Sequence, residues 1–199
     1  VDNEATTAAN ADLPATARAV LGILSFGDAL TGYDVKRWAD QSLAFFYWAP
    51  SQSQIYGELR RLEALGLVDS LVEQTHAAKS KRVYRITESG MRQMREWADD
   101  PVLEPVVLKH PMVLRLWAAH NGDRRRLVAA LLEHEQDAND RAERAASHAR
   151  NAADVPAWHF SSLSLEWSAR YWREEADRTA WMRERLEAEL SGPSDLGLA

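Results

Sequence analysis

The sequence contains no cysteine, and this removes several classes of site. Without a thiol the chain has no disulfide, no thiolate zinc site and no cysteine nucleophile, so its stability must come from packing. It also lacks any apolar run near the roughly 18 residues that a membrane-spanning helix needs. Residues 1–14 carry neither a basic nor an apolar signal segment, and we therefore expect a cytoplasmic protein without a membrane partner.

Motifs of the common enzyme classes are missing as well. The sequence has no Gly-x-Gly-x-x-Gly, no phosphate-binding Gly-Lys-Ser/Thr loop, no Gly-x-Ser-x-Gly and no His-Glu-x-x-His. The acidic cluster from Glu133 to Asp137 contains His134, but His134 is turned by about 100° from Glu133 on a helix, so these groups do not converge. This pattern predicts no catalytic residue, no cofactor and no metal site, and a place for His134 in a helix seam.

What the chain does have is ordinary globular composition with many large aromatic residues. Hydrophobic residues make up 46% and charged residues 27% of its 199 positions, and there are eight tryptophans. Prolines between 101 and 111 divide the chain into a part with short mixed elements and a part that is almost entirely helical in pattern. We predict a disordered tail over 1–12, a first domain over 13–100, a second over 101–192 and a tail over 193–199.

Three helices are predicted in the first domain. Apolar residues at helical spacing follow Pro14 and stop at Gly27, and Thr31 is placed to cap a second helix over 32–41. The third helix begins with Ser51 and Gln54 at the spacing of a capping box and ends at Gly66. Its predicted buried stripe consists of Ile55, Leu59, Leu62 and Leu65.

The pattern then changes to that of β-strands. Residues 67–74 and 82–87 are β-branched and partly alternating, and the polar, basic segment 75–81 lies between them. Thr87 is placed to cap a further helix. Three helices, a small β-hairpin and a closing helix predict a winged helix-turn-helix, in a protein that is mainly α.

The start of the third helix has the side chains that a recognition helix needs. Residues near the N-terminus of such a helix contact base edges in the DNA major groove, and Gln and Ser both bond to bases. Gln52 and Ser53 are the predicted base contacts, because capping occupies Ser51 and Gln54. The segment 50–95 contains eight basic and five acidic residues and is therefore locally positive, although the whole chain has a net charge of -6. The predicted phosphate contacts are Ser51, Tyr56, Arg60, Arg61, Lys79, Lys81 and Arg82.

Each of these features also has a simpler explanation. A Ser-Gln helix start is a common cap, and paired arginines near Glu58 and Glu63 can form an ordinary solvated face. A basic hairpin can merely protect a strand edge from pairing. The three features in this order, after two short helices, are more specific for DNA binding than any one of them.

The same residues resemble a known family. Over about residues 15–98 the sequence is similar to the N-terminal domain of PadR-type transcriptional regulators. The chain departs from that pattern at Ser53 and Gln54, where the family commonly has a Gly-Thr type pair, and in a wing that is not rich in glycine. The shared motifs are Gly32 and Tyr33, Pro50 and Ser51, Ile55 and Tyr56, the segment 59–67, and the segment 84–90.

The second domain is predicted to hold two chains together. Asp123 is placed to cap a long helix whose apolar and small residues repeat at alternating four and three, as in a coiled coil. A last helix after Pro156 has an apolar sector too wide for a lone amphipathic helix. This half resembles the helical dimerisation domain of longer PadR-type proteins. The predicted interface residues are Leu127, Leu131, Ala138, Ala145, Leu163, Trp167 and Tyr171.

A twofold dimer would present two recognition helices to inverted half-sites in double-stranded DNA. The resemblance implies a repressor that a small-molecule effector, often aromatic, releases from its operator. The alternative function is a winged-helix scaffold that binds proteins or ligands without specific DNA binding. Five tryptophans could line an effector pocket, or could simply pack the core and interface: Trp117, Trp158, Trp167, Trp172 and Trp181.

Overall fold

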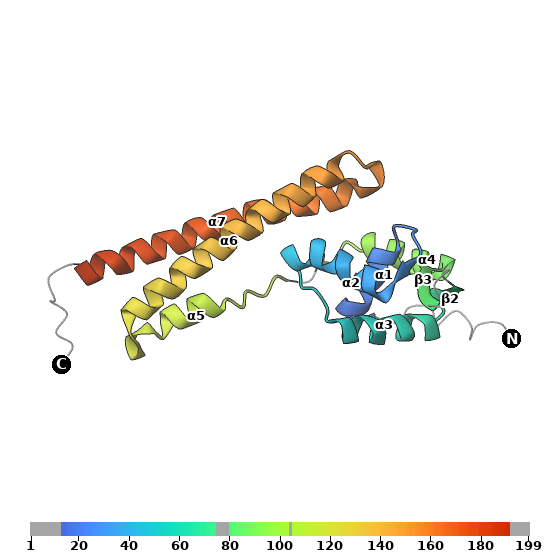
Figure 1. Cartoon of the computed structure of the whole chain (residues 1–199), viewed down its shortest axis with the longest axis horizontal. Helices are drawn as coiled ribbons and strands as arrows, with labels where there is room; N and C mark the ends of the chain where they lie inside the picture. The colour runs from blue at the N-terminus through green and yellow to red at the C-terminus, as the bar shows by residue number, and fades with distance from the viewer. Residues whose placement is uncertain (1–12, 75–79, 104, 192–199) are drawn as a thin grey trace. The chain divides into compact units, whose positions relative to one another are not determined.

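The protein is mostly helical and divides into two compact units, residues 1–104 and 105–199. Its structure is a computed structural model that describes residues 13–74, 80–103 and 105–191 (Figure 1). The tails predicted at 1–12 and 193–199 lie outside the described residues. Among those described, no helix has the length and apolarity needed to cross a membrane.

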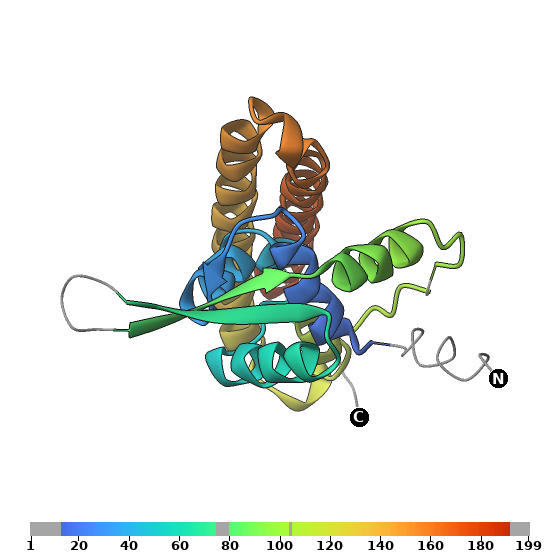
Figure 2. The same cartoon turned by 90° about the vertical axis from the view of Figure 1, so that its right-hand side faces the viewer.

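The first unit is a winged helix, as the sequence predicts. The third helix, α3, packs on α1 and α2, and the strands β2 and β3 form the wing beside it (Figure 2). The elements are α1 (Ala15–Leu24), β1 (Leu30–Thr31), α2 (Gly32–Gln41), a 3-10 turn (Leu43–Phe45), α3 (Gln52–Ala64), β2 (Val68–Gln74), β3 (Ser80–Ile86) and α4 (Glu88–Ala98).

The predicted helix starts are confirmed at the level of individual hydrogen bonds. The Thr31 side chain accepts from the Asp34 N–H at 3.1 Å, and the Asp34 carboxylate accepts from the Thr31 backbone in return, which makes a full capping box. Hydrogen bonds from Thr31 lower the pKa of Asp34 below its usual value, although burial opposes them. Thr87 caps α4 by accepting from the Gly90 N–H.

The sheet has three strands in the order β1-β3-β2, so the predicted two-stranded hairpin is incomplete. The short β1 pairs antiparallel with β3, with Leu30 opposite Tyr84 and Thr31 opposite Val83. A two-residue strand is too short to show alternation in a sequence, which explains why the pattern does not reveal it. This pairing joins the start of α2 to the base of the wing.

The core of the first unit lies between the helices and the sheet. Ile55, Leu59 and Leu62 are fully buried, but Leu65 is 46% exposed, so its predicted place in the stripe is wrong. The reason is the helix end. Gly66 adopts a left-handed backbone (φ 68°) and turns the chain, so that Leu67 enters the core while its N–H donates to the Leu62 carbonyl.

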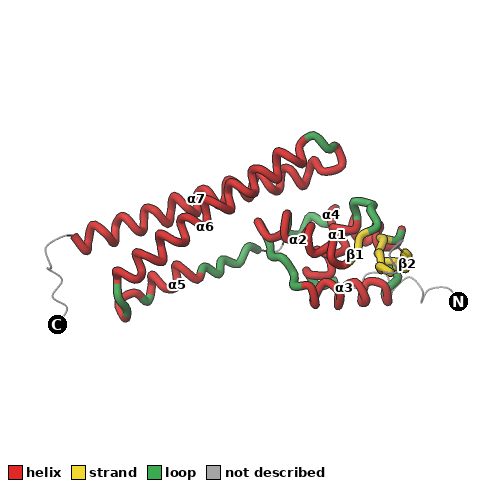
Figure 3. Tube along the Cα trace, viewed as in Figure 1, coloured by secondary structure: helices red, strands yellow, loops and turns green. Residues whose placement is uncertain are grey.

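The second unit is a helical hairpin preceded by a short helix (Figure 3). Two long helices, α6 and α7, pack against each other over much of their length. The buried positions of α6 are mostly alanines at alternating four and three, namely Ala138, Ala142, Ala145, Ala149 and Ala152, which permits close approach of the two backbones. The elements are α5 (Pro111–Trp117), a 3-10 turn (Ala119–Asn121), α6 (Arg124–Ala153), a 3-10 turn (Pro156–Trp158) and α7 (His159–Ser191).

Candidate nucleic-acid interface

The exposed face of α3 carries Ser53, Tyr56 and Arg60 at helical spacing, opposite the buried stripe. Arg61 lies on the flank of this face. Neither Arg60 nor Arg61 forms an ion pair with any residue within the described ranges, so both guanidinium groups are available to an anion. A hydroxyl near the helix N-terminus followed by arginines about two turns later suits a base edge followed by phosphates.

The N-terminus of α3 is a complete capping box. The Ser51 hydroxyl accepts from the Gln54 N–H at 3.3 Å, and the Gln54 side-chain oxygen accepts from the Ser51 N–H at 2.8 Å. The Ser51 hydroxyl also shares a hydrogen bond with the Ser53 hydroxyl at 3.0 Å. Capping therefore occupies Ser51, as predicted, and leaves Ser53 as the exposed hydroxyl beside it.

Gln52 is held differently from what the sequence suggests. Its side-chain amide donates to the backbone carbonyl of Gly32 at 3.3 Å, so it ties the start of α3 to the start of α2. The Tyr56 ring lies so close to Gly32 that a Cβ there would come within 2.4 Å of it. A side chain at Gly32 would therefore displace the ring. This accounts physically for a glycine at the position and places Gln52 and Tyr56 on one side of the helix.

The wing residues are engaged in ion pairs. Arg82 bonds the Glu63 carboxylate at 3.0 Å and the Ser70 hydroxyl at 2.7 Å, and the Ser70 hydroxyl in turn donates to Glu63. Lys81 pairs with Glu73 directly across the hairpin at 3.1 Å. Of the predicted phosphate contacts, Arg82 thus already serves to fasten the wing to α3, and Lys79 lies outside the described residues.

We expect Arg82→Ala to loosen the wing and to leave the protein's contacts with DNA phosphates largely unchanged. Removing the guanidinium breaks its bonds to Glu63 and Ser70, and because the side chain is half exposed the loss should be about 1 kcal/mol or less. Hydrogen exchange in β2 and β3 should rise, as it should in the matched variant Glu63→Gln. A fall of about 0.9 in the slope of log affinity against log salt, seen in Arg82→Ala alone, would instead identify a phosphate contact.

The second unit corrects part of the predicted dimer interface. Leu131, Ala138 and Ala145 are completely buried within the single chain, so they cannot also form an exposed contact surface. Their four-three repeat is the pattern of a helix seam, and it does not distinguish packing within a chain from packing between chains. The exposed members are Leu163 and Trp167, while Leu127 and Tyr171 are half-buried.

The five tryptophans do not enclose one pocket within a chain. Trp117 precedes α6 and Trp158 follows it, and this helix of 30 residues is about 45 Å long. Trp167 and Trp181 are separated by about 21 Å of α7. Trp172 instead stacks under the Arg141 guanidinium, 4.7 Å from its ring centre, and Trp167 stacks on Tyr171.

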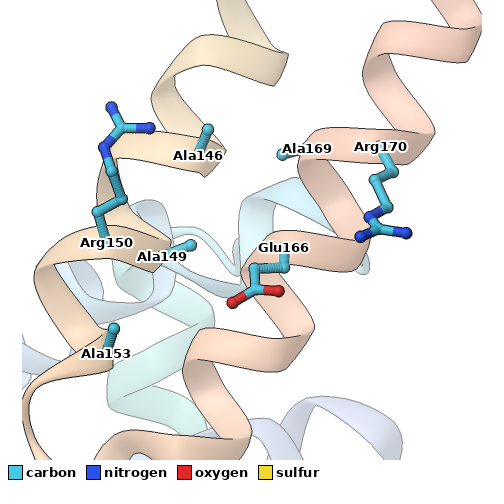
Figure 4. Close-up of a pocket in the computed structure, with 7 residues that line it drawn as sticks. All are labelled: Ala146, Ala149, Arg150, Ala153, Glu166, Ala169 and Arg170. Carbon is cyan, nitrogen blue, oxygen red and sulfur yellow. The ribbon is translucent and has the colours of Figure 1, made fainter.

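An open hollow of about 300 Å³ lies elsewhere, between α6 and α7 (Figure 4). Its floor consists of alanines, and its rim carries Arg150, Glu166 and Arg170. None of the five tryptophans lines it.

Sequence reasoning also missed a polar cluster in the second unit. The side chains of His110, His134 and Glu175 converge there from three different elements. His134 was expected in a helix seam, and it does face α7, but its partner Glu175 lies 41 residues away along the chain. A motif search looks for ligands at short spacing on one helix, so it has no means of finding this group.

The first unit is similar in sequence to known transcriptional regulators. Residues 20–96 match the profile of the transcriptional regulator PadR-like family. The negative transcriptional regulator PadR of Bacillus subtilis is 29% identical over 99 residues, which are 50% of this chain and 53% of that protein, so the match spans about half of its length. The probable transcriptional regulator Rv1176c of Mycobacterium tuberculosis is 32% identical over 74 residues, 37% of this chain and 39% of that protein.

Solved structures share the fold over most of the chain. Bacillus subtilis PadR in complex with operator DNA has a TM-score of 0.75 at 18% identity and covers 88% of this chain and 99% of its own. The PadR-like regulator BC1756 of Bacillus cereus has a TM-score of 0.74 at 21% identity, with 89% of this chain and 99% of its own covered. The winged helix, its motifs and these matches agree: residues 20–96 of this chain have the sequence and fold of the DNA-binding part of PadR-like transcriptional regulators.

Proposed function

We propose that the protein is a sequence-specific DNA-binding regulator that represses transcription and has no catalytic role. The observation that carries this proposal is the exposed face of α3, where Ser53 is followed by Tyr56 and by Arg60, which pairs with no acid in the part of the chain that the structure describes. Support comes from Bacillus subtilis PadR, a negative regulator whose structure in complex with operator DNA has the same fold. Phosphates would anchor the helix through Arg60 and Arg61, and Ser53 would contact a base edge.

We further propose that the protein binds DNA as a homodimer. The short helix α5 buries none of its residues within the chain, and Leu114 and Trp117 on it are 65% and 78% exposed. Phe160, Leu163 and Trp167 near the start of α7 are also exposed. So many exposed large apolar side chains are typical of a surface that binds another protein chain. A second copy would supply the second recognition helix, and the two would address inverted half-sites about 34–36 Å apart.

Release by a small molecule follows from the same arrangement. A ligand that prefers dimers with a different spacing of the two α3 helices weakens DNA binding by its differential affinity, and about 1.4 kcal/mol changes the affinity tenfold. Bacillus subtilis PadR has also been solved in complex with p-coumaric acid, with a TM-score of 0.65 at 20% identity to this chain. This supports an aromatic effector here. For the tryptophans to line the effector site, those of one chain would have to meet those of the other chain across the dimer interface.

The test is a fluorescence-anisotropy titration of the purified full chain. The probe is DNA from immediately upstream of its own coding region, compared with scrambled DNA of equal length at two salt concentrations. We expect tighter binding to the upstream DNA, weakened by salt. Absence of binding to either DNA at low salt would contradict the proposal and favour a scaffold without DNA binding.

Ser53→Ala should reduce discrimination between the upstream and scrambled DNA. Loss of one good base contact costs about 1–3 kcal/mol on the specific sequence and little on the scrambled one. Gln52→Ala is the informative comparison, because Gln52 also holds Gly32, and its replacement should lower stability as well. If Ser53→Ala weakened both DNAs equally, Ser53 would be a phosphate contact and not a base contact.

A further inference from the structure

Three elements of the second unit bring two imidazoles to one carboxylate oxygen. His110 caps α5, His134 lies in α6 and Glu175 lies in α7. The Nε2 atoms of His110 and His134 lie 2.7 Å and 2.9 Å from the same oxygen, Oε1 of Glu175. All three potential ligand atoms are within 4.8 Å of one another. The two rings lie edge to face, with their centres 5.7 Å apart.

The carboxylate at this point is buried and charged. The Glu175 side chain is 5% exposed, and its other oxygen is 3.7 Å from the Arg178 guanidinium. Burial alone would raise the pKa of Glu175, but the hydrogen bonds from His134 and His110 outweigh it and hold this pKa below its usual value. A buried carboxylate with two imidazoles is also the donor set of a three-ligand zinc site.

We propose that the protein binds one divalent transition-metal cation of the zinc class through Nε2 of His110, Nε2 of His134 and Oε1 of Glu175. Ligand atoms around a tetrahedral zinc ion, at about 2.0–2.1 Å from it, are about 3.3 Å apart. The present separations of 2.7 and 2.9 Å need to widen by about half an ångström, within reach of small rotations of the side chains. The fourth position is left to water, since the His134 side chain is 28% exposed and opens the cluster to solvent.

The position of the ring proton on His110 is compatible with metal binding. The Nδ1 atom of His110 accepts a 3.3 Å hydrogen bond from the Val113 N–H, so its Nε2 carries the ring proton that points at Glu175. A cation on Nε2 requires that proton to move to Nδ1, and the long cap bond is lost. The loss is small, because this N–H is exposed at a helix start where water can replace the acceptor.

Cation binding would therefore fasten the start of α5 to both long helices. This goes beyond the proposed function, since it depends on the second unit and not on α3. It also gives the chain a second possible input besides a small-molecule effector. Arg178 pairs with Glu174 and with the other oxygen of Glu175, Oε2, and Arg183 pairs with Glu135, so none of these ion pairs uses the three proposed ligand atoms.

The test is calorimetric titration of the full chain with zinc chloride. We expect one zinc per chain, with at least about a 100-fold weaker affinity in Glu175→Gln and in His134→Gln, because even a residue that only supports a ligand costs about 10- to 100-fold when changed. Gln at 175 keeps an oxygen that can accept from both imidazoles, so this variant should fold, as circular dichroism would verify. His159→Gln, an exposed histidine on α7, is the matched control and should bind zinc normally.

Two results would overturn the site. One is the absence of saturable zinc binding to the unmodified chain, and the other is binding that Glu175→Gln and His134→Gln leave unchanged. The cobalt(II) complex gives an independent readout, since a tetrahedral site produces intense visible absorption that Glu175→Gln should abolish. DNA binding is measured separately with α3 intact, so failure of the metal site and failure of the proposed regulator are distinguishable.

Discussion

Replacing Arg60 and Arg61 together with alanine is expected to weaken DNA binding about 10- to 100-fold, on upstream and scrambled DNA alike. Both guanidinium groups are exposed on α3 and neither is engaged by an acid among the described residues, so a phosphate can bind them without breaking an existing pair. Each phosphate contact contributes about 0.9 to the slope of log affinity against log salt. The slope should therefore fall by nearly two in the double variant.

The matched control removes two charges from another element. Arg124 and Arg125 are exposed and adjacent at the start of α6, and the variant in which both are alanine changes the net charge equally. Its salt slope should stay that of the unmodified protein. If both double variants lowered the slope by the same amount, the effect would come from overall charge and α3 would lose its assigned role.

Gly90→Ala is expected to destabilise the winged helix by about 1–3 kcal/mol or more, the range found for overpacking of a tight site. A Cβ at this position would lie 2.2 Å from the Leu67 carbonyl oxygen and 2.7 Å from a side-chain carbon of Ile86. The same carbonyl accepts from the Thr87 N–H at 3.0 Å, so it cannot withdraw without breaking the junction between the sheet and α4. Urea denaturation, with hydrogen exchange of the segment 55–98, measures the loss.

Gly57 offers the control in the same unit. It lies within α3, and a Cβ there meets nothing within 4 Å. Gly57→Ala should therefore stabilise the helix by up to about 1 kcal/mol, since alanine has the higher helix propensity. Equal destabilisation by both substitutions would show that crowding at Leu67 is not the cause.

The parts of this structure that the sequence predicts are those set by neighbours three or four residues apart. Ser51 with Gln54, the Thr87 cap and the turn at Gly66 are local devices, and each is where the sequence places it. The pairing of β1 with β3 and the contact of Arg82 with Glu63 join distant segments, and no local pattern encodes them.

The same limit applies to the candidate sites. Ser53, Arg60 and Arg61, the predicted DNA contacts, are all exposed because one helix orients them, and their contacts with DNA stay a prediction. Gln52 is a predicted base contact, but in the structure its amide donates to a carbonyl 20 residues earlier in the chain. The seam positions Leu131, Ala138 and Ala145 carry the right period, yet a period does not state whether the partner helix belongs to the same chain.

The alanine seam between α6 and α7 leads to a separation of tasks. Small side chains, together with Leu131 and Leu165, form the buried seam of the hairpin, whereas Trp167 and Trp181 lie outside it and are 56% and 59% exposed. Exchanging an outward tryptophan should therefore alter which surface the hairpin recognises while leaving its own fold intact. Relatives that share this hairpin could diverge in their choice of partner subunit without first having to redesign the hairpin.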